Sequence, residues 1–105
     1  MAAGIIELTS ETDFAEQVEQ ADQPVVVDFW APWCGPCQMQ GKVLEELTAK
    51  HGDKARVVKV NVDDVPALAQ RFGVQSIPTI LIFKDGAMVE QKVGLMSLED
   101  LESKL

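Results

Sequence analysis

The sequence predicts an α/β protein with a central mixed β-sheet covered by helices on both faces. Two observations predict this fold class. First, apolar runs of strand length alternate with amphipathic helical stretches along residues 5–73, which requires crossover connections and makes the sheet mostly parallel. Second, two later strand-like runs flank an Asp85-Gly86 turn, which adds an antiparallel hairpin near the C-terminus. No linker, repeat or low-complexity tract divides the chain, so we expect a single domain over residues 1–105.

Five strands are predicted from apolar and β-branched runs. They cover residues 5–8, 25–29, 56–62, 79–83 and 87–93. The second run is apolar except for Asp28, a pattern typical of a central strand that is covered on both faces. The third run has a β-branched residue at every second position, which favours another central strand.

Four helices are predicted between and after the strands, and polar residues mark where they begin. Thr12 is the expected cap of a helix over residues 12–20, with Ser10 and Asp13 as an alternative capping pair. Asp64 is expected to cap a short third helix that Gly73 ends. The last helix follows Ser97, and its inward face is formed by Leu98, Leu101 and Leu105.

The second helix is predicted over residues 34–50 and is the longest. Its expected apolar stripe consists of Met39, Val43, Leu44 and Leu47. Gly52 is the expected end of this helix. In open α/β sheets, ligand chemistry lies at the carboxyl ends of central strands, and residues 31–37 occupy that place here.

The acidic composition argues against some classes of function, nucleic-acid binding above all. The chain has 9 Lys and Arg against 17 Asp and Glu, a net charge of −8, so a phosphate backbone would be repelled and nucleic-acid binding is disfavoured. The start of the sequence has neither a basic segment nor a long apolar run, and the longest continuous apolar stretch is residues 80–83. We therefore expect a soluble, cytoplasmic protein without a membrane partner.

The two cysteines of the chain are the strongest functional signal. Cys34 and Cys37 are separated by Gly35 and Pro36 and lie between a buried strand and a helix. Residues i and i+3 of a helix share one face, at a Cα separation of roughly 5 Å that suits a disulfide. A ring this small adds little stability through chain entropy. The spacing therefore favours a disulfide that opens and closes over one that holds the fold together.

The two sulfurs are expected to have different roles. Cys34 lies at the start of the helix, where unpaired N–H groups and the helix dipole favour a thiolate, the nucleophilic form. Cys37 lies one turn further on and is expected to be more buried, with the higher pKa. We therefore predict that Cys34 attacks a substrate disulfide and that Cys37 resolves the intermediate.

Zinc binding and a passive disulfide are the alternatives for this pair. Zinc prefers four ligands, and the single histidine, His51, lies at the far end of the second helix, so no metal is predicted. A passive disulfide is not expected in a cytosolic domain with 47% apolar residues, which is enough to build a core.

The sequence around the cysteines resembles the active-site segment of the thioredoxin family. The matching segments are VDFWAPWCGPC at residues 27–37, KVNVD at 59–63, FGV at 72–74, IPT at 77–79, FKDG at 83–86 and VG at 93–94. They occur in the family's order and spacing over essentially the whole chain. The resemblance implies the thioredoxin fold and a monomeric protein-disulfide reductase that serves electron transport and cell redox homeostasis. It also implies disulfide-containing target proteins, no bound cofactor, and electrons from NADPH through a flavin-containing thioredoxin reductase.

Asp28 interrupts an apolar strand just before the cysteines. An unpaired buried carboxylate is costly, so its pKa is expected to rise. One interpretation is that Asp28 accepts the proton of Cys37, directly or through a water, as the matching Asp is held to do in thioredoxins. The other is that Lys59, on a neighbouring strand, satisfies a buried structural Asp28. The two interpretations are compatible, and we assign Asp28 a catalytic and Lys59 a supporting role.

A docking surface for the substrate is implied by the resemblance. From the sequence alone, the Ile77-Pro78 bond is expected to be trans, whereas thioredoxins carry a cis proline that faces the two cysteines. The Ile77 backbone would there pair with an extended substrate segment. The predicted surface consists of Trp33, Gly35, Pro36, Ile77, Pro78 and Gly94, with Leu95 as a further candidate. Trp30 is expected to support the site by packing beside it.

The sequence departs from the family pattern at two positions near the cysteines. Lys42 stands where thioredoxins commonly have a helix-kinking proline, which favours a straighter second helix. Gln38 stands where a Lys is common, which removes a cation near the thiolate.

Two other functions stay open at this point. One is a thioredoxin-fold oxidase or isomerase, although such proteins usually have a His between the cysteines. The other is a non-enzymatic binding subunit that uses the same apolar surface.

Overall fold

The computed structural model describes residues 4–105 and contains one five-stranded mixed sheet. Its strands are β1 (Ile5–Leu8), β2 (Val25–Trp30), β3 (Arg56–Asn61), β4 (Thr79–Lys84) and β5 (Ala87–Val93). They lie in the order β1-β3-β2-β4-β5, with β1, β3 and β2 parallel and with β4 and β5 antiparallel to their neighbours. The predicted fold class is confirmed, and the parallel part of the sheet extends over three strands.

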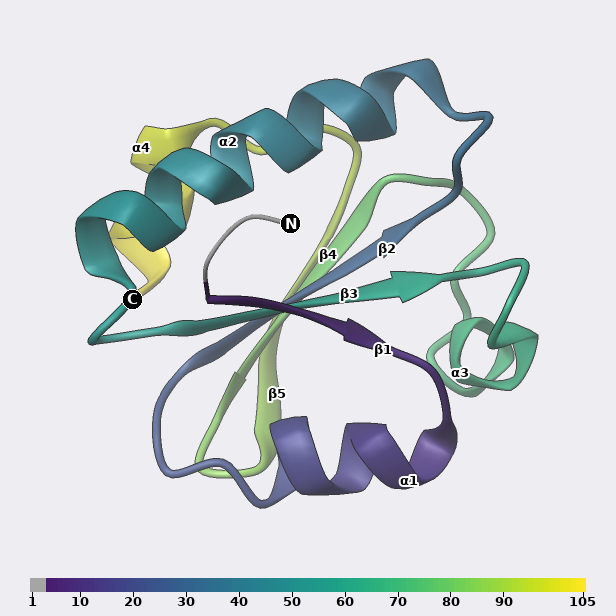
Figure 1. The fold of residues 1–105 in the computed structure, drawn as a ribbon, viewed down its shortest axis with the longest axis horizontal. Coiled ribbons are helices and arrows are strands. Elements are labelled where there is room, and N and C mark those ends of the chain that lie inside the picture. Colours follow the sequence, from purple (N-terminus) through teal and green to yellow (C-terminus); the bar gives the residue numbers. More distant parts are fainter. Residues whose placement is uncertain (1–3) are drawn as a thin grey trace.

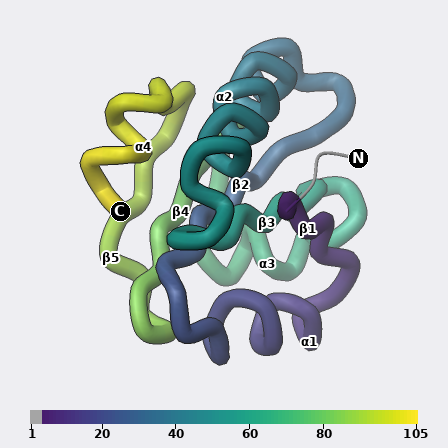
Figure 2. Tube along the Cα trace, turned by 60° about the vertical axis from the view of Figure 1, so that its left-hand side comes forward, coloured from purple at the N-terminus to yellow at the C-terminus, as the bar shows by residue number. Residues whose placement is uncertain are grey.

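Helices cover both faces of the sheet. They are α1 (Glu11–Phe14) with the π-helical turn η1 (Ala15–Glu19), α2 (Gly35–His51), α3 (Pro66–Arg71) and α4 (Leu98–Lys104). Figure 1 shows α2 and α4 on one side of the sheet and α1 and α3 on the other. In the rotated view of Figure 2, α4 again lies beside α2, with the sheet between them and α1.

The alternation of side chains along the strands produces two apolar cores. One core packs α1, η1 and α3 on the sheet and includes Phe14, Val18, Leu68, Val25, Val27, Phe29, Val58, Val60, Leu81 and Phe83. The other lies under α2 and α4 and includes Ile5, Val26, Leu44, Leu47, Val57, Ile80, Ile82, Met96 and Leu101. Because successive residues of a strand point to opposite faces, Asp28, two residues after Val26, lies on the α2 face of the sheet.

Two of the predicted helix caps are wrong. The side chain of Ser10, not Thr12, caps α1 by accepting a hydrogen bond from the Asp13 N–H, so the alternative capping pair is the one formed. Val65, not Asp64, precedes α3, and no side chain caps that helix. The prediction for the last helix is confirmed, since the Ser97 hydroxyl accepts from the Asp100 N–H.

The predicted apolar stripe of α2 is wrong at Met39. This side chain is 58% exposed, while its neighbour Gln40 is fully buried. The buried positions of α2 are Cys37, Gln40, Leu44 and Leu47, which follow the i, i+3, i+7, i+10 spacing of one helix face. Met39 lies one residue off that face. Because Gln40 is polar, the apolar pattern did not indicate that it is the buried residue.

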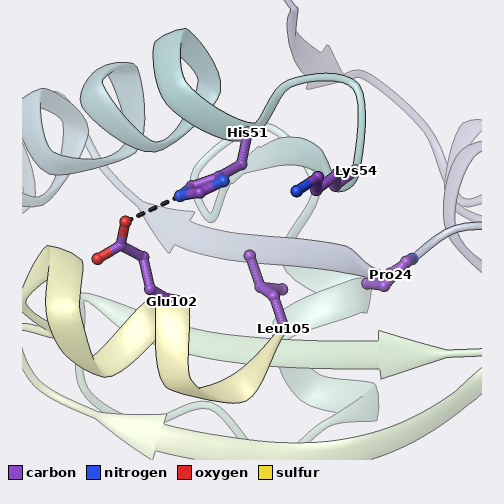
Figure 3. Close-up of a pocket in the computed structure, with 5 residues that line it drawn as sticks. All are labelled: Pro24, His51, Lys54, Glu102 and Leu105. Carbon is purple, nitrogen blue, oxygen red and sulfur yellow. Dashed lines mark hydrogen bonds and ion pairs between the residues drawn. The ribbon is translucent and has the colours of Figure 1, made fainter.

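A pocket of about 340 Å³ lies at the far end of α2 from the cysteines. Figure 3 shows its lining residues, Pro24, His51, Lys54, Glu102 and Leu105. His51 Nε2 lies 2.8 Å from Glu102 Oε2, which links the end of α2 to α4. The pocket is therefore remote from the thiol chemistry, and His51 belongs to a contact between two helices.

Candidate active site

The two cysteines form a disulfide where β2 passes into α2. Their Cα atoms are 5.2 Å apart, close to the separation that their spacing predicts. Cys34 has an extended backbone and is the N-cap of α2, and its Sγ accepts a hydrogen bond from the Cys37 N–H at 3.2 Å. The same N–H would stabilise a thiolate on Cys34 in the reduced protein, because charge strengthens such a bond.

Both cysteine residues are buried, and Cys37 is the more buried of the two, as predicted. Cys34 is 6% exposed and Cys37 is 2% exposed. Trp30, Ala31, Val62 and Ile77 pack around the pair. Gly35 and Pro36 are exposed beside them, and a Cβ atom added at Gly35 would have no neighbour within 4 Å. An incoming molecule can therefore approach the disulfide over the spacer residues.

The predicted docking residues lie around the disulfide. The Ile77-Pro78 peptide bond is cis, and the Ile77 carbonyl oxygen lies 3.8 Å from Cys34 Sγ. The Gly94 N–H donates to the Pro78 carbonyl at 2.8 Å, which joins two segments of this surface.

Trp33 projects from the same surface and is 70% exposed. Its indole N–H donates to Asp63 Oδ2 at 2.9 Å, so one edge of the ring is fixed while the remainder faces solvent. An exposed aromatic ring held in this way offers a rigid apolar contact to a partner.

Asp28 is fully buried on the α2 face of β2. Neither of its carboxylate oxygens has a hydrogen-bond partner among residues 4–105. Burial raises the pKa of Asp28 from its ordinary value of 3.8 to about 7, while the positive charge of Lys59 opposes this rise and the negative charge of Glu7 adds to it. The carboxylate can therefore take up or release a proton near neutral pH.

Lys59 does not satisfy Asp28 by direct contact, so that part of the structural interpretation is wrong. The two residues are register partners on β2 and β3, but the ammonium group of Lys59 lies 4.1 Å from the centre of the Trp30 ring. A Cβ atom added at Gly41 would lie 3.7 Å from Lys59 Nζ, so the ammonium group lies beside α2 at this glycine. Lys59 acts on Asp28 through its charge, and it binds Trp30 through a cation–π contact.

Trp30 connects this charge cluster to the first strand. Its indole N–H donates to Glu7 Oε2 at 3.1 Å, and it packs beside the disulfide as predicted. Burial raises the pKa of Glu7, and the hydrogen bond from Trp30 and the charge of Lys59 oppose that rise. The site thus has a second layer of Glu7, Trp30 and Lys59 behind the cysteines and Asp28.

Sequence reasoning missed several residues that the structure brings to the site. Glu7, Asp63, Gly41 and Gln40 were not identified, although the spacing of three residues between Cys37 and Gln40 places both on the same helix face. Gln38, one of the two departures from the family pattern, donates from its amide to the Pro32 carbonyl at 3.3 Å. Lys42, the other departure, lies within the uninterrupted helix α2.

Residues 4–105 contain no group of three or more His, Cys, Asp or Glu side chains placed to hold a metal ion. None of the helices in this range has the length and apolar character required to cross a membrane.

These features define a class of protein: a thiol–disulfide oxidoreductase whose reactive pair is a CxxC motif at the start of a helix. The thioredoxin family model matches residues 5–105. The chain is 50% identical over 90 residues to a thioredoxin of Alicyclobacillus acidocaldarius, with 86% of each chain covered. It is 46% identical over 95 residues to a thioredoxin of Bacillus subtilis (90% of this chain, 91% of the relative) and 44% identical over 96 residues to thioredoxin 1 of Synechococcus elongatus (91% and 90%). The chain belongs to the thioredoxin family.

Proposed function

We propose that this protein acts as a single-domain reductase of disulfides in other proteins. The observation that carries the proposal is the position of Cys34 Sγ at the helix N-cap, where it accepts the Cys37 N–H. That position stabilises a thiolate and leaves the sulfur beside the exposed spacer. The Gly-Pro spacer, which has no His, supports the reducing direction over the oxidase and isomerase alternatives.

The reaction begins with the reduced pair. The Cys34 thiolate attacks one sulfur of the target disulfide, the target S–S bond breaks, and one target thiolate leaves while a mixed disulfide forms. Cys37 then loses its proton and attacks Cys34 Sγ, which releases the second target thiolate and forms the Cys34–Cys37 disulfide. Two electrons pass to the target, and the described structure corresponds to the oxidised product.

Asp28 is proposed to accept the proton of Cys37, directly or through a water. A base with a pKa near the working pH is the most effective, and the pKa of Asp28 is about 7. Asp28 lies on the face of the sheet that α2 covers, and Cys37 is the first buried residue of α2. Lys59 and Trp30 support this arrangement by the contacts described above.

The substrate is proposed to dock as an extended segment against the exposed surface around the disulfide. The residues assigned to this surface are Trp33, Gly35, Pro36, Ile77, Pro78 and Gly94. The Ile77 backbone, beside Cys34, would add the segment as a short strand, while Trp33 supplies apolar contact.

Electrons are proposed to come from NADPH through a flavin-containing thioredoxin reductase, with no cofactor held by this chain. The family assignment supports this partner. A cytoplasmic location and a monomeric state complete the proposal, and the net charge of −8 favours solubility.

Reduction of insulin disulfides with dithiothreitol as the donor tests the proposed function. Wild type should accelerate insulin reduction, Cys34→Ser should be inactive, and Cys37→Ser should accumulate the mixed disulfide. The surface variant Ser103→Ala is a matched control. Equal activity of wild type and Cys34→Ser would contradict the assignment, and equilibration with glutathione that gives a strongly oxidising pair would contradict the reducing direction.

A further inference from the structure

Gln40 is a buried polar residue that the thiol chemistry does not use. It lies on α2, one helical turn after Cys37, and its side chain is fully buried among apolar residues. A buried amide is costly unless it is hydrogen-bonded, so its partners indicate what it does.

Both partners of Gln40 belong to the backbone of one residue. Gln40 Nε2 donates to the Met96 carbonyl at 3.1 Å, and the Met96 N–H donates to Gln40 Oε1 at 2.8 Å. The side-chain amide thus exchanges two hydrogen bonds with Met96, as a residue of a neighbouring strand would. These bonds join the helix that carries the cysteines to a segment 56 residues further along the chain.

The segment held by Gln40 is part of the surface around the disulfide. It runs from Gly94 to Met96, between β5 and α4. At its start, Gly94 has a φ of +97° and donates its N–H to the Pro78 carbonyl. At its end, Met96 is buried under α2, and between the two the Leu95 side chain is exposed. The segment is therefore fixed at one end by Pro78 and at the other by Gln40.

We propose that Gln40 is a positioning residue that fixes the segment of Gly94, Leu95 and Met96 for the docking of protein disulfides. The inference rests on the proposed function, because it concerns the same docking surface. Without the two bonds, the N–H and the carbonyl of Met96 would both lose their hydrogen-bond partner. The segment would then have to be ordered when the substrate binds. Ordering a short segment on binding reduces affinity and leaves the chemistry at Cys34 unchanged.

Apolar substitutions at Gln40 test this role. Gln40→Met and Gln40→Leu retain a buried side chain but remove both hydrogen bonds, and whichever of them folds gives the test. The KM for insulin should rise about 3- to 10-fold, because the cost of ordering the segment is added to binding. The kcat for insulin and the rate with hydroxyethyl disulfide, which is too small to use the docking surface, should stay within about twofold of wild type.

A destabilised variant elsewhere separates positioning from general loss of stability. Val58→Ala removes apolar contacts from the core on the opposite face of the sheet and touches neither Gln40 nor Met96. It should leave the KM for insulin unchanged. Hydrogen exchange provides a second readout. Exchange of the Met96 amide should accelerate in the Gln40 variants by more than their loss of global stability accounts for, and in Val58→Ala by no more than its loss of global stability accounts for.

The outcomes distinguish the proposal from the function on which it rests. If Met96 exchange accelerates while the KM for insulin stays at the wild-type value, Gln40 is purely structural and the proposal is wrong. A parallel loss of activity on both substrates, matched by Val58→Ala, would also overturn it. Failure of the wild-type protein to reduce insulin would instead refute the proposed function itself, and the docking role with it.

Discussion

Asp28 and Gln40 are two fully buried polar side chains near the disulfide, and their surroundings are opposite. The carboxylate of Asp28 has no hydrogen-bond partner among residues 4–105, whereas the amide of Gln40 exchanges two hydrogen bonds with Met96. Both lie between the sheet and α2, so the difference is one of pairing and not of depth.

This difference indicates that Asp28 is suited to proton transfer and that Gln40 is suited to holding the backbone in place. An unpaired buried acid has a raised pKa and a proton that it can exchange near pH 7, at a cost to stability. A fully paired amide stabilises the backbone that it binds and has no proton to exchange in this range. We therefore expect substitution of Asp28 to increase stability and reduce exchange, and substitution of Gln40 to reduce stability.

The largest expected effect is on the stability of Asp28→Asn as a function of pH. The folded pKa of Asp28 is about 7, above its ordinary value of 3.8, so protonation favours the folded state. Wild type should lose stability as pH rises from about 4 to 7, by up to about 4 kcal/mol, and the loss should then level off. Asp28→Asn should lack this loss and be the more stable protein above pH 7.

Urea unfolding of the oxidised protein between pH 4 and 8 measures this difference. Asp13→Asn is the control without a slope: hydrogen bonds from Thr9 lower the pKa of Asp13 below its ordinary value of 3.8, so its contribution is lost only at lower pH and should stay constant over this range. Parallel stability curves for wild type and Asp28→Asn would show that Asp28 is not a buried acid with a raised pKa.

The next largest expected effect is on the rate at which the Asp28→Asn variant resolves the mixed disulfide. Removing a general base should slow the attack of Cys37 on the mixed disulfide by about 10²-fold at pH 7. Alkylation of Cys34 in the reduced protein, which does not require this proton transfer, should change far less. An unchanged pH–rate profile for release of the target would remove Asp28 from the mechanism.

A smaller effect is expected on the stability of Gln40→Leu. Loss of the two bonds to Met96 should destabilise the fold by about 2 kcal/mol, since each unmet backbone group costs about 1 kcal/mol or more. The loss should be the same at pH 5 and pH 8, because Gln40 has no titrating proton. Urea unfolding at both pH values measures this loss of stability. If Gln40→Leu were more stable than wild type, the expected difference between Gln40 and Asp28 would be wrong.

The sequence identified Asp28 but not Gln40, for a physical reason. A charged residue inside an apolar strand contrasts with its neighbours, so Asp28 stands out. A glutamine in a helix of mixed composition does not, so the sequence predicted Met39 at the buried position that Gln40 occupies. The partners of Gln40 are backbone groups 56 residues away, which no local pattern reveals.

The strands, the cysteine geometry and the final hairpin were predictable because they depend on local periodicity and spacing. The capping of α1 and the contact between Lys59 and Trp30 were not, because each depends on a choice between nearby polar partners that the tertiary structure makes. For the cis bond before Pro78, the sequence alone favours trans, and the family resemblance indicated the cis form that the structure contains.

The smallest expected effect concerns the charges that face Asp28. The positive charge of Lys59 lowers the pKa of Asp28 and the negative charge of Glu7 raises it. Lys59→Met should therefore shift the pH–rate profile to higher pH. The rate of thiol–disulfide exchange at pH 7 should fall by about twofold, while the plateau rate at high pH stays unchanged. Glu7→Gln should move the profile in the opposite direction, and comparison of the two profiles is the measurement. If both substitutions lowered the plateau alike, their effect would be through the packing of Trp30, and the charge of Asp28 would not be what they control.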